Sequence, residues 1–218
     1  MLYFIGKVLS WLLFKIFGHL KVIGHENIPL SGGVVLTANH TSYADPPLVG
    51  LSCSPRGVWF MAKEELFVNP VMKNILSKIH AFPIKRASVD RQALRRAHEL
   101  LTSGKAVTIF FEGRRSRDGR LQLPELGTAM IALRANVPIV PMALINSDLL
   151  LPRKGGIKFT RITVAIGEPL YFPHLAGKSG DREALREVSE SIARQVARLM
   201  RENGAAKRVP DKYLEESL

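Results

Sequence analysis

The chain has 218 residues, 46% of them hydrophobic and 23% charged, which is ordinary for a globular protein of one domain, or one domain with an appendage. Its single cysteine, Cys53, excludes an internal disulfide framework and suits a reducing compartment, and without a nearby base its thiol is expected to be inert. The 31 Lys and Arg residues against 19 Asp and Glu residues give a net charge of +12, which favours an anionic partner: nucleic acid, acidic lipid or a phosphorylated small molecule.

The first 17 residues, MLYFIGKVLSWLLFKIF, are apolar almost all round. Read as a helix, they place Tyr3, Lys7, Trp11 and Lys15 on one stripe and leave aliphatic and Phe side chains over the rest. Such a helix is about 26 Å long, short of the ~30 Å hydrocarbon core of a bilayer, and it lacks the basic start and cleavage site of a signal peptide. We therefore expect residues 1–19 to form a membrane-associating helix that lies in the interface, with a core helix of the domain as the alternative.

Apolar periodicity, prolines and glycines predict the elements of the remaining chain. In chain order they are a strand at 20–23, a strand at 33–38, a helix that begins at Asp45-Pro46 with Asp45 as its N-cap, a strand at 57–61, a helix at 64–79 with a break at Asn69-Pro70, a strand at 81–84, a helix at 88–103, a strand at 106–111, a helix at 126–135, strands at 138–145 and 157–167, and a helix at 181–201. Residues after Asn203 lack periodicity and are expected to trail off.

Apolar strands that alternate with amphipathic helices indicate an α/β fold, with a mixed, partly parallel sheet covered by helices on both faces. We find no internal repeat and no long linker, so residues 20–204 are expected to form one domain, followed by a C-terminal tail at 205–218. In such sheets functional residues collect just beyond the carboxyl ends of strands. That rule picks out residues 39–45 and 112–116.

The first of these stretches lies in TANHTSYADPP, residues 37–47, which follows directly on an apolar strand. With His40 at the strand end and Asp45 at a helix start, the loop between them can fold the carboxylate back onto the imidazole. A carboxylate that holds one ring nitrogen fixes the tautomer and supports the positive charge formed when the other nitrogen takes a proton. The pattern predicts a general base with its orienting acid; the alternative is a helix cap at Asp45 and a turn residue at His40.

The second stretch is FFEGRRSR, residues 110–117, at the end of another apolar strand. Arginine guanidinium groups around a glycine turn form a fork-shaped site that suits a phosphate group. The alternative is a solvated basic turn.

Together with two further segments, these stretches resemble a known family, the glycerophospholipid acyltransferases, whose type members are the 1-acyl-sn-glycerol-3-phosphate acyltransferases. TANHTSYADP resembles the family's N-H-x-S-x-x-D-P block, and the segment Phe82 to Arg86 (FPIKR) resembles its second block. FEGRRS resembles the F-P-E-G-T-R-S block, and VPIVP, residues 137–141, resembles the fourth. The blocks occur in the family's order between Ile23 and Leu144, with two departures: Phe111 replaces a proline and Arg114 a threonine.

The resemblance implies a set of site residues. His40 would act as the catalytic base and Asp45 would orient its ring. The substrate-binding residues would be Lys63, Arg86, Glu112, Gly113, Arg115 and Ser116. Among these, Arg86, Arg115 and Lys63 would bind the acceptor's phosphate, Glu112 would position an arginine or the acceptor, and Gly113 would allow close backbone approach.

The reaction that the resemblance implies is transfer of a fatty acyl group from acyl-CoA or an acyl-carrier protein to the free hydroxyl of 1-acylglycerol-3-phosphate (lysophosphatidic acid). The product would be phosphatidic acid in phospholipid biosynthesis, made on the cytoplasmic face of a membrane with an anionic surface. No cofactor is expected besides the acyl thioester co-substrate, and no metal is expected, because the six histidines lack ligand spacing. The alternatives are another lysophospholipid or lipid-like acceptor and, outside enzymes, a basic nucleic-acid-binding protein, although the basic residues show no nucleic-acid motif.

Overall fold

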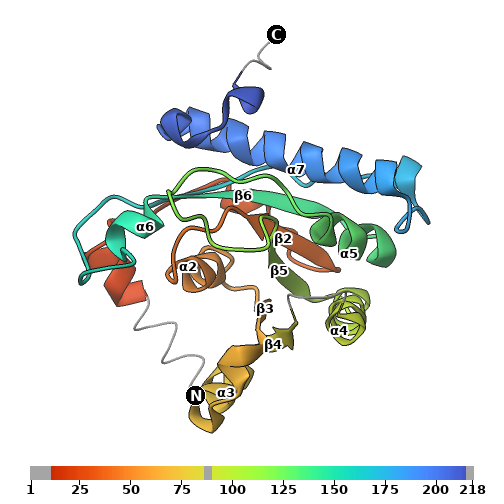
Figure 1. Cartoon of the computed structure of the whole chain (residues 1–218), viewed down its shortest axis with the longest axis horizontal. Coiled ribbons are helices and arrows are strands. Elements are labelled where there is room, and N and C mark those ends of the chain that lie inside the picture. The colour runs from red at the N-terminus through yellow and green to blue at the C-terminus, as the bar shows by residue number, and fades with distance from the viewer. Residues whose placement is uncertain (1–10, 86–89, 215–218) are drawn as a thin grey trace.

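The computed structural model describes residues 11–85 and 90–214, and within them one mixed sheet is covered by helices on both faces (Figure 1). The strands are β1 (Lys21–Ile23), β2 (Val34–Ala38), β3 (Val58–Lys63), β4 (Ala81–Ile84), β5 (Ala106–Phe110), β6 (Ile139–Ile145) and β7 (Thr163–Ile166). Their order across the sheet is β1-β7-β6-β2-β5-β3-β4, and every neighbouring pair is parallel except β6 with β7. The predicted fold class is confirmed.

The helices connect these strands and close the chain. They are α2 (Asp45–Ser52), α3 (Pro70–Lys78), α4 (Arg91–Thr102), α5 (Gly127–Ala135), α6 (Ser147–Leu150) and α7 (Arg182–Glu202), with short 3-10 turns η1 (His25–Asn27), η2 (Glu64–Phe67), η3 (Pro173–Leu175), η4 (Ala206–Arg208) and η5 (Asp211–Tyr213). The sequence predicts α2, α3, α4, α5 and α7 to within a few residues, and η2 lies inside the helix predicted at 64–79. It does not predict α6 or the 3-10 turns η1, η3, η4 and η5.

Alternation along β2 divides the interior into two cores. Val34, Leu36 and Ala38 face one core, which also holds Phe14 and side chains of α2. Val35 faces the other core, which α4, α5 and α7 cover. Because both faces of the central strands are buried, β2 and β5 are apolar except for Thr37 and Thr108, as is usual for parallel strands between helix layers.

Aspartate and asparagine caps set where three of the helices begin. Asp181 accepts hydrogen bonds from the first amides of α7, and Asp90 and Asn69 do the same for α4 and α3. The helix predicted to begin at Ser88 therefore starts at Arg91, although residues 86–89 lie outside the described part of the chain. The apolar stripe of α7, which includes Leu185, Val188, Ile192, Val196 and Leu199, is buried along its whole length.

The strand predicted at 157–167 is shorter than expected, since β7 begins only at Thr163. The residues before it pair with the N-terminal part of the chain instead. Thr160 N–H donates to the carbonyl of Phe17 at 2.9 Å, and Ile162 N–H donates to the carbonyl of Gly18 at 2.7 Å. Hydrogen bonds to a non-strand partner thus replace the ladder that the apolar pattern suggested.

The expectation that the chain trails off after Asn203 is wrong for the segment that follows it. Ala205, Val209 and Tyr213 are buried in the core beside α7, and Arg201 donates to the carbonyl of Tyr213 at 2.6 Å. Single buried residues in irregular turns have no period that a sequence pattern could detect. Residues 215–218 lie outside the described part.

The predicted N-terminal helix can be described only in part, because residues 1–10 lie outside the described residues. Residues 11–16 are helical, with Phe14 buried in a core while Trp11 and Ile16 remain about half exposed. None of the helices described in the structure combines the length and apolarity needed to cross a bilayer. The interfacial location of this helix stays a prediction.

Candidate active site

The site is built at the carboxyl ends of the central parallel strands. β2 lies between β6 and β5, so the loops that follow these three strands emerge at the same edge of the sheet. The loop after β2 carries residues 39–44, and the loop after β5 carries residues 111–126. Ser116 N–H donates to the carbonyl of His40 at 2.7 Å, which joins the two predicted loops directly.

The predicted contact between the imidazole and the carboxylate is present. Nδ1 of His40 lies 2.7 Å from Oδ2 of Asp45; the histidine is nearly buried and the aspartate completely so. Because a carboxylate only accepts, Nδ1 carries the proton of this bond and Nε2 is left as the proton acceptor of the neutral ring. The ring of Phe110 stacks on the imidazole with centroids 4.0 Å apart and fixes its plane.

Asp45 is not the N-cap of α2, and that part of the prediction is wrong. The helix includes Asp45 as its first residue, and its N-cap, Ala44, has no side-chain hydrogen bond. The carboxylate turns back into the loop instead, where Oδ2 also accepts from the amides of Thr41 at 2.7 Å and Ser42 at 2.8 Å. The aspartate therefore shapes the loop that presents His40 as well as holding the ring.

The glycine turn of the second loop has a backbone that favours glycine. Gly113 has a φ of +67°, and its N–H donates to the carbonyl of Phe110 at 3.0 Å. A Cβ at this position would lie 3.0 Å from Cγ of Glu125, so the turn also needs the space that glycine leaves. This geometry directs Arg115 and Ser116 back toward the first loop.

Arg115 lies against the first loop. Its guanidinium carbon is 3.6 Å from the centroid of the Tyr43 ring, a close cation–π contact. Ser116 is buried and donates from its hydroxyl to Asp118 at 2.8 Å. The structure therefore brings together six of the predicted site residues: His40, Asp45, Glu112, Gly113, Arg115 and Ser116.

Glu112 is a buried acid beside the base. It is 2% exposed, and neither carboxyl oxygen has a hydrogen-bond partner among the described residues. Burial raises the pKa of Glu112 to about 8, and the nearby charges of Asp45 and Asp118 add to the rise. The backbone N–H groups of Gln122 and His40 oppose it in part by their proximity, although neither meets hydrogen-bond geometry. Glu112 pairs with no arginine among the described residues, which do not include Arg86, so its positioning role stays a prediction. With a pKa of about 8 it is mostly neutral at pH 7.

The two remaining predicted residues are placed differently. Lys63 stands at the carboxyl end of β3, and its ammonium pairs with Glu65 at 2.6 Å on the exposed surface. Arg86 lies outside the described residues.

Sequence reasoning missed residues that come from the third loop at this edge, after β6. Arg153 donates to the carbonyl of Ser116 at 3.0 Å, and the hydroxyls of Ser147 and Thr41 are 2.9 Å apart. The side-chain amide of Asn39, at the end of β2, holds β2 to β6: its Nδ2 donates to the carbonyl of Leu144, and its Oδ1 accepts from the N–H of Leu144. Functional residues collect beyond the carboxyl ends of parallel strands, and this rule would have selected the loop after β6 if β6 had been known to lie beside β2.

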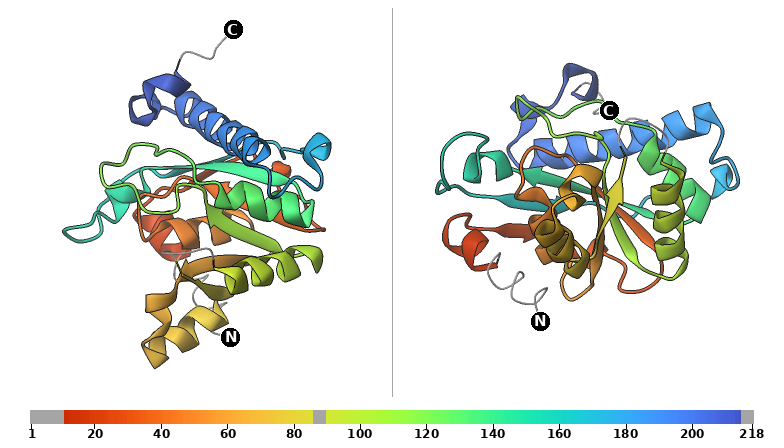
Figure 2. Two further views of the ribbon diagram at one scale, coloured as in Figure 1. Left: turned by 45° about the vertical axis from the view of Figure 1, so that its right-hand side comes forward. Right: turned by 60° about the horizontal axis from the view of Figure 1, so that its bottom comes forward.

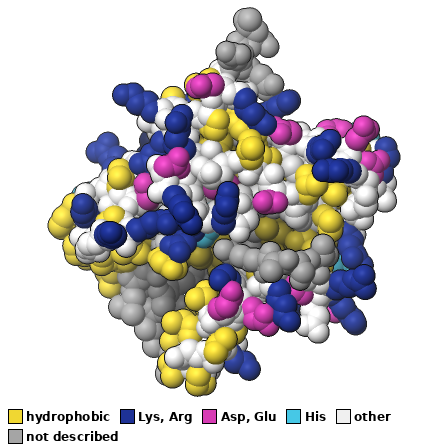
Figure 3. All heavy atoms as spheres, in the orientation of Figure 1, with side chains coloured by type: hydrophobic (Ala, Val, Ile, Leu, Met, Phe, Trp, Pro, Cys, Tyr) yellow, Lys and Arg dark blue, Asp and Glu magenta, His cyan; other side chains and the backbone are white. Residues whose placement is uncertain are grey.

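Positive charge gathers on the face that carries these loops, as Figure 3 shows. The loops after β5 and α6 contribute Arg114, Arg115, Arg117, Arg120, Arg153 and Lys154. An anionic group would be attracted to this face from solution.

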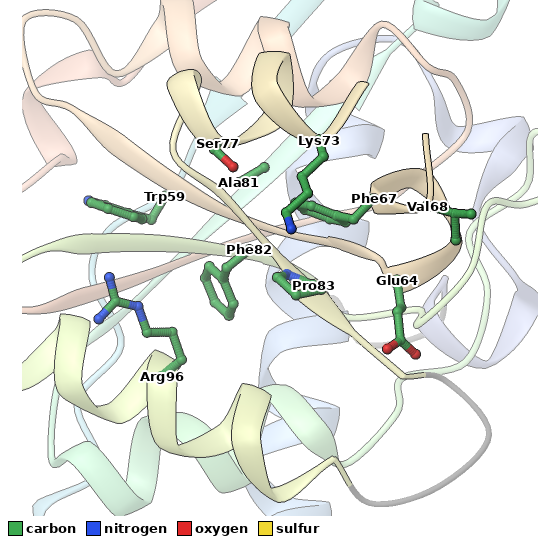
Figure 4. A pocket seen from close by; sticks show the side chains of 10 residues that line it. All are labelled: Trp59, Glu64, Phe67, Val68, Lys73, Ser77, Ala81, Phe82, Pro83 and Arg96. Carbon is green, nitrogen blue, oxygen red and sulfur yellow. The ribbon is translucent and has the colours of Figure 1, made fainter. Parts of the chain in front are cut away.

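A groove of about 470 Å³ opens between the β3–β4 end of the sheet and α4 (Figure 4). Trp59, Phe67 and Phe82 give it apolar walls, and Lys73 and Arg96 stand at its sides. Phe82 belongs to the segment that resembles the family's second block. Neither His40 nor Asp45 is among the residues that line this groove.

The arrangement as a whole supplies a proton acceptor beside a cationic surface. Nε2 of His40 can take a proton from a hydroxyl, because Asp45 holds the opposite nitrogen and can stabilise the imidazolium that results. Arg115 can hold an anionic group next to that hydroxyl. Among the described residues, no cluster of three or more His, Cys, Asp or Glu side chains is suited to a metal ion.

Comparison with known proteins gives consistent matches. A family model described as Acyltransferase matches residues 19–145. The chain is similar to the 1-acyl-sn-glycerol-3-phosphate acyltransferase of Bacillus subtilis (strain 168), with 32% identity over 188 residues, 84% of this chain and 88% of that protein. It is 31% identical over 198 residues to the chloroplastic 1-acyl-sn-glycerol-3-phosphate acyltransferase BAT2 of Brassica napus, covering 87% of this chain and 56% of that protein.

A solved structure agrees with these matches. The 1-acyl-sn-glycerophosphate acyltransferase of Thermotoga maritima superposes with a TM-score of 0.71 at 28% identity, covering 94% of this chain and 78% of that chain.

Proposed function

This chain belongs to the acyltransferase family, as its four blocks predict, and we propose that it transfers a fatty acyl group from an acyl thioester to the free hydroxyl of 1-acylglycerol-3-phosphate. The product is phosphatidic acid, an intermediate of phospholipid biosynthesis. The observation that carries the proposal is the buried pair of His40 and Asp45, joined by the Ser116–His40 hydrogen bond to a loop that holds Arg115.

In the proposed reaction, the acceptor's hydroxyl oxygen attacks the thioester carbonyl carbon while Nε2 of His40 takes the hydroxyl proton. Asp45, on Nδ1, stabilises the imidazolium. The tetrahedral intermediate then collapses, the carbon–sulfur bond breaks, and the imidazolium returns its proton to the leaving thiolate. The thiol of coenzyme A or of an acyl-carrier protein is released, and His40 is regenerated without a covalent enzyme intermediate.

Acceptor recognition is proposed to depend on the cationic residues of the second loop. Arg115 would bind the phosphate of the acceptor with its planar guanidinium, while Tyr43 limits the orientations of that side chain. Arg86 and Lys63 would add positive charge, and Ser116 would keep the loop in place through its backbone bond to His40. A mostly neutral Glu112 adds little negative charge to repel the phosphate.

The site is proposed to work at a membrane surface on its cytoplasmic face, where the acceptor and the product reside. The apolar N-terminal segment supports this location. Phe14 anchors its described part in the domain, while Trp11 and Ile16 remain exposed and available to contact lipid. The net charge of +12 would favour a membrane rich in anionic lipids.

A thioester-consumption assay on purified protein with 1-acylglycerol-3-phosphate tests the proposal. Wild type should release free thiol in step with phosphatidic acid, and His40→Ala should reduce the rate by about 10²–10⁴-fold while the fold is retained. A His40→Ala rate above a few per cent of wild type would exclude the general-base role. A panel of other lysophospholipids, assayed in parallel, identifies the acceptor: preference for another headgroup would overturn the assignment to 1-acylglycerol-3-phosphate.

A further inference from the structure

The helix α3 leaves its apolar side chains uncovered. None of its residues is buried, although Pro70–Lys78 includes Val71, Met72 and Ile75. Together with Leu66 and Val68 just before it, these side chains are 38% to 80% exposed. A continuous set of exposed aliphatic residues on one short segment marks a surface that meets another apolar phase.

The η2–α3 segment, residues 64–78, stands at the edge of the sheet that carries the candidate active site. It follows the carboxyl end of β3, which runs parallel to β5, and β5 in turn lies beside β2. Figures 1 and 2 show α3 projecting from the β3–β4 end of the molecule, and in Figure 3 yellow side chains cover this projection. One wall of the groove in Figure 4 is made by the same segment.

The charges around this surface fit an anionic layer. The charged residues of α3 are Lys73 and Lys78, with no acidic residue in the helix. The acids of η2 are paired, since Glu65 contacts Lys63 at 2.6 Å and Glu64 contacts Lys85 at 3.8 Å. An exposed aliphatic set with cations and no free acid on the helix is the pattern of an interfacial membrane helix.

We propose that residues 64–78 form a lipid-contact surface that enters the headgroup region of a membrane containing anionic lipids. A bilayer containing anionic lipids is the occupant that the charges favour, because the exposed aliphatic set lies beside Lys73 and Lys78 and α3 carries no acid. The inference rests on the proposed function, because a lipid acceptor is the reason to expect this protein at a membrane. Contact at this edge would place the strand ends that carry His40 toward the layer that holds the acceptor.

Site-specific fluorescence tests the contact directly. Met72→Cys and, as a control, Leu30→Cys can each be labelled with an environment-sensitive fluorophore, because the native Cys53 is 1% exposed and protected from labelling. Leu30 precedes the amino end of β2, at the opposite edge of the sheet. With vesicles of phosphatidylcholine and phosphatidylglycerol, emission at position 72 should shift to the blue while emission at position 30 should not.

Two outcomes of that measurement would overturn the proposal. The first is an unshifted spectrum at position 72 on protein that sediments with the vesicles. The second is a spectrum at position 72 that is already shifted without vesicles, which would mean that protein rather than lipid covers α3.

A paired substitution supplies an independent readout. Val71→Ser/Met72→Ser should weaken vesicle binding by about tenfold or more, whereas Leu30→Ser/Tyr171→Ser, at the amino ends of β2 and β6, should change it by less than about twofold. Transfer to acceptor dispersed in detergent should be unchanged in both variants. Equal vesicle binding by the two variants would refute the contact. Vesicle binding is measured without turnover, so a failure of the proposed acyl transfer leaves this result interpretable.

Discussion

At the scale of single residues, the candidate site depends on which hydrogen bonds the Asp45 carboxylate accepts. One oxygen, Oδ2, accepts from the His40 ring and from two loop amides, so the same carboxylate holds the base and the backbone that presents it. A charge-assisted network of this kind is stronger than its neutral counterpart and keeps the ring in one tautomer. A substitution that removes the charge of Asp45 but keeps its shape separates stabilisation of the imidazolium from support of the loop backbone.

Asp45→Asn is expected to lower kcat by about 10²–10⁴-fold while the KM of the acceptor stays within about threefold of wild type. A neutral amide oxygen at the position of Oδ2 can still accept from the His40 ring and from the two loop amides, but it lacks the charge that stabilises the imidazolium. Steady-state kinetics with varied acceptor measures the two constants. The double variant His40→Ala/Asp45→Asn should be little slower than His40→Ala alone, because the two residues act as one unit; additive losses would contradict this.

Glu112 gives the protein a pH-dependent stability whose sign follows from its pKa. Burial raises the pKa from the ordinary value of 4.5 to about 8, so between these values the folded state keeps a proton that the unfolded state has lost. The contribution is complete below about pH 4.5 and is lost as the pH rises through about 8. Stability therefore falls with rising pH in this window.

Glu112→Gln is neutral at every pH and should flatten that dependence. Between about pH 5 and about pH 9, the free energy of unfolding of wild type should fall by a few kcal/mol more than that of the variant. Denaturant titrations at several pH values measure both. Glu125→Gln, in the same loop but exposed, is the matched control and should follow wild type; identical slopes for all three proteins would rule out the buried acid as the cause.

At the scale of elements, the segment after α7 reaches the loops of the site. Arg208 donates to Asp148 of α6 at 2.7 Å, and its carbonyl accepts from Leu121 N–H at 2.8 Å in the second loop. Ser147, next to Asp148, contacts Thr41 of the first loop. The C-terminal turn η4 thus supports the second and third loops directly and the first loop through Ser147, although it lies beyond the region that the family model matches.

Arg208→Ala should therefore destabilise the protein by about 1 kcal/mol or more, because the pair with Asp148 is three-quarters buried. Lys212→Ala is the matched control: it breaks the more exposed pair with Glu190, also at a short distance of 2.9 Å, and should cost less than about 0.5 kcal/mol. Urea denaturation measures both. A smaller effect for Arg208→Ala than for Lys212→Ala would show that the C-terminal support is not needed.

At the scale of the whole molecule, the sheet order decides which loops meet. β2 is flanked by β6 and β5, so the loop with His40 is adjacent both to the loop with Arg115 and to the loop with Arg153. Lys and Arg side chains gather where these loops emerge (Figure 3), which suits an anionic acceptor held at a membrane surface. The projecting α3 stands at that same edge.

The sequence by itself determined the local features of this protein. The apolar period predicts most helices and strands, because burial on one or both faces imposes that period on the residues themselves. The pair His40 and Asp45 and the loop of residues 112–116 were predicted for the same reason, since strand ends and the family's blocks are local patterns. Their contact is confirmed, while their catalytic and binding roles remain proposals.

Only the tertiary structure decided what depends on contacts between distant parts of the chain. The place of Arg153 and the burial of Tyr213 depend on which segments pack together, and no local period records this. Long-range packing adds these details after local propensity has set the elements, because each one requires the sheet to be assembled first.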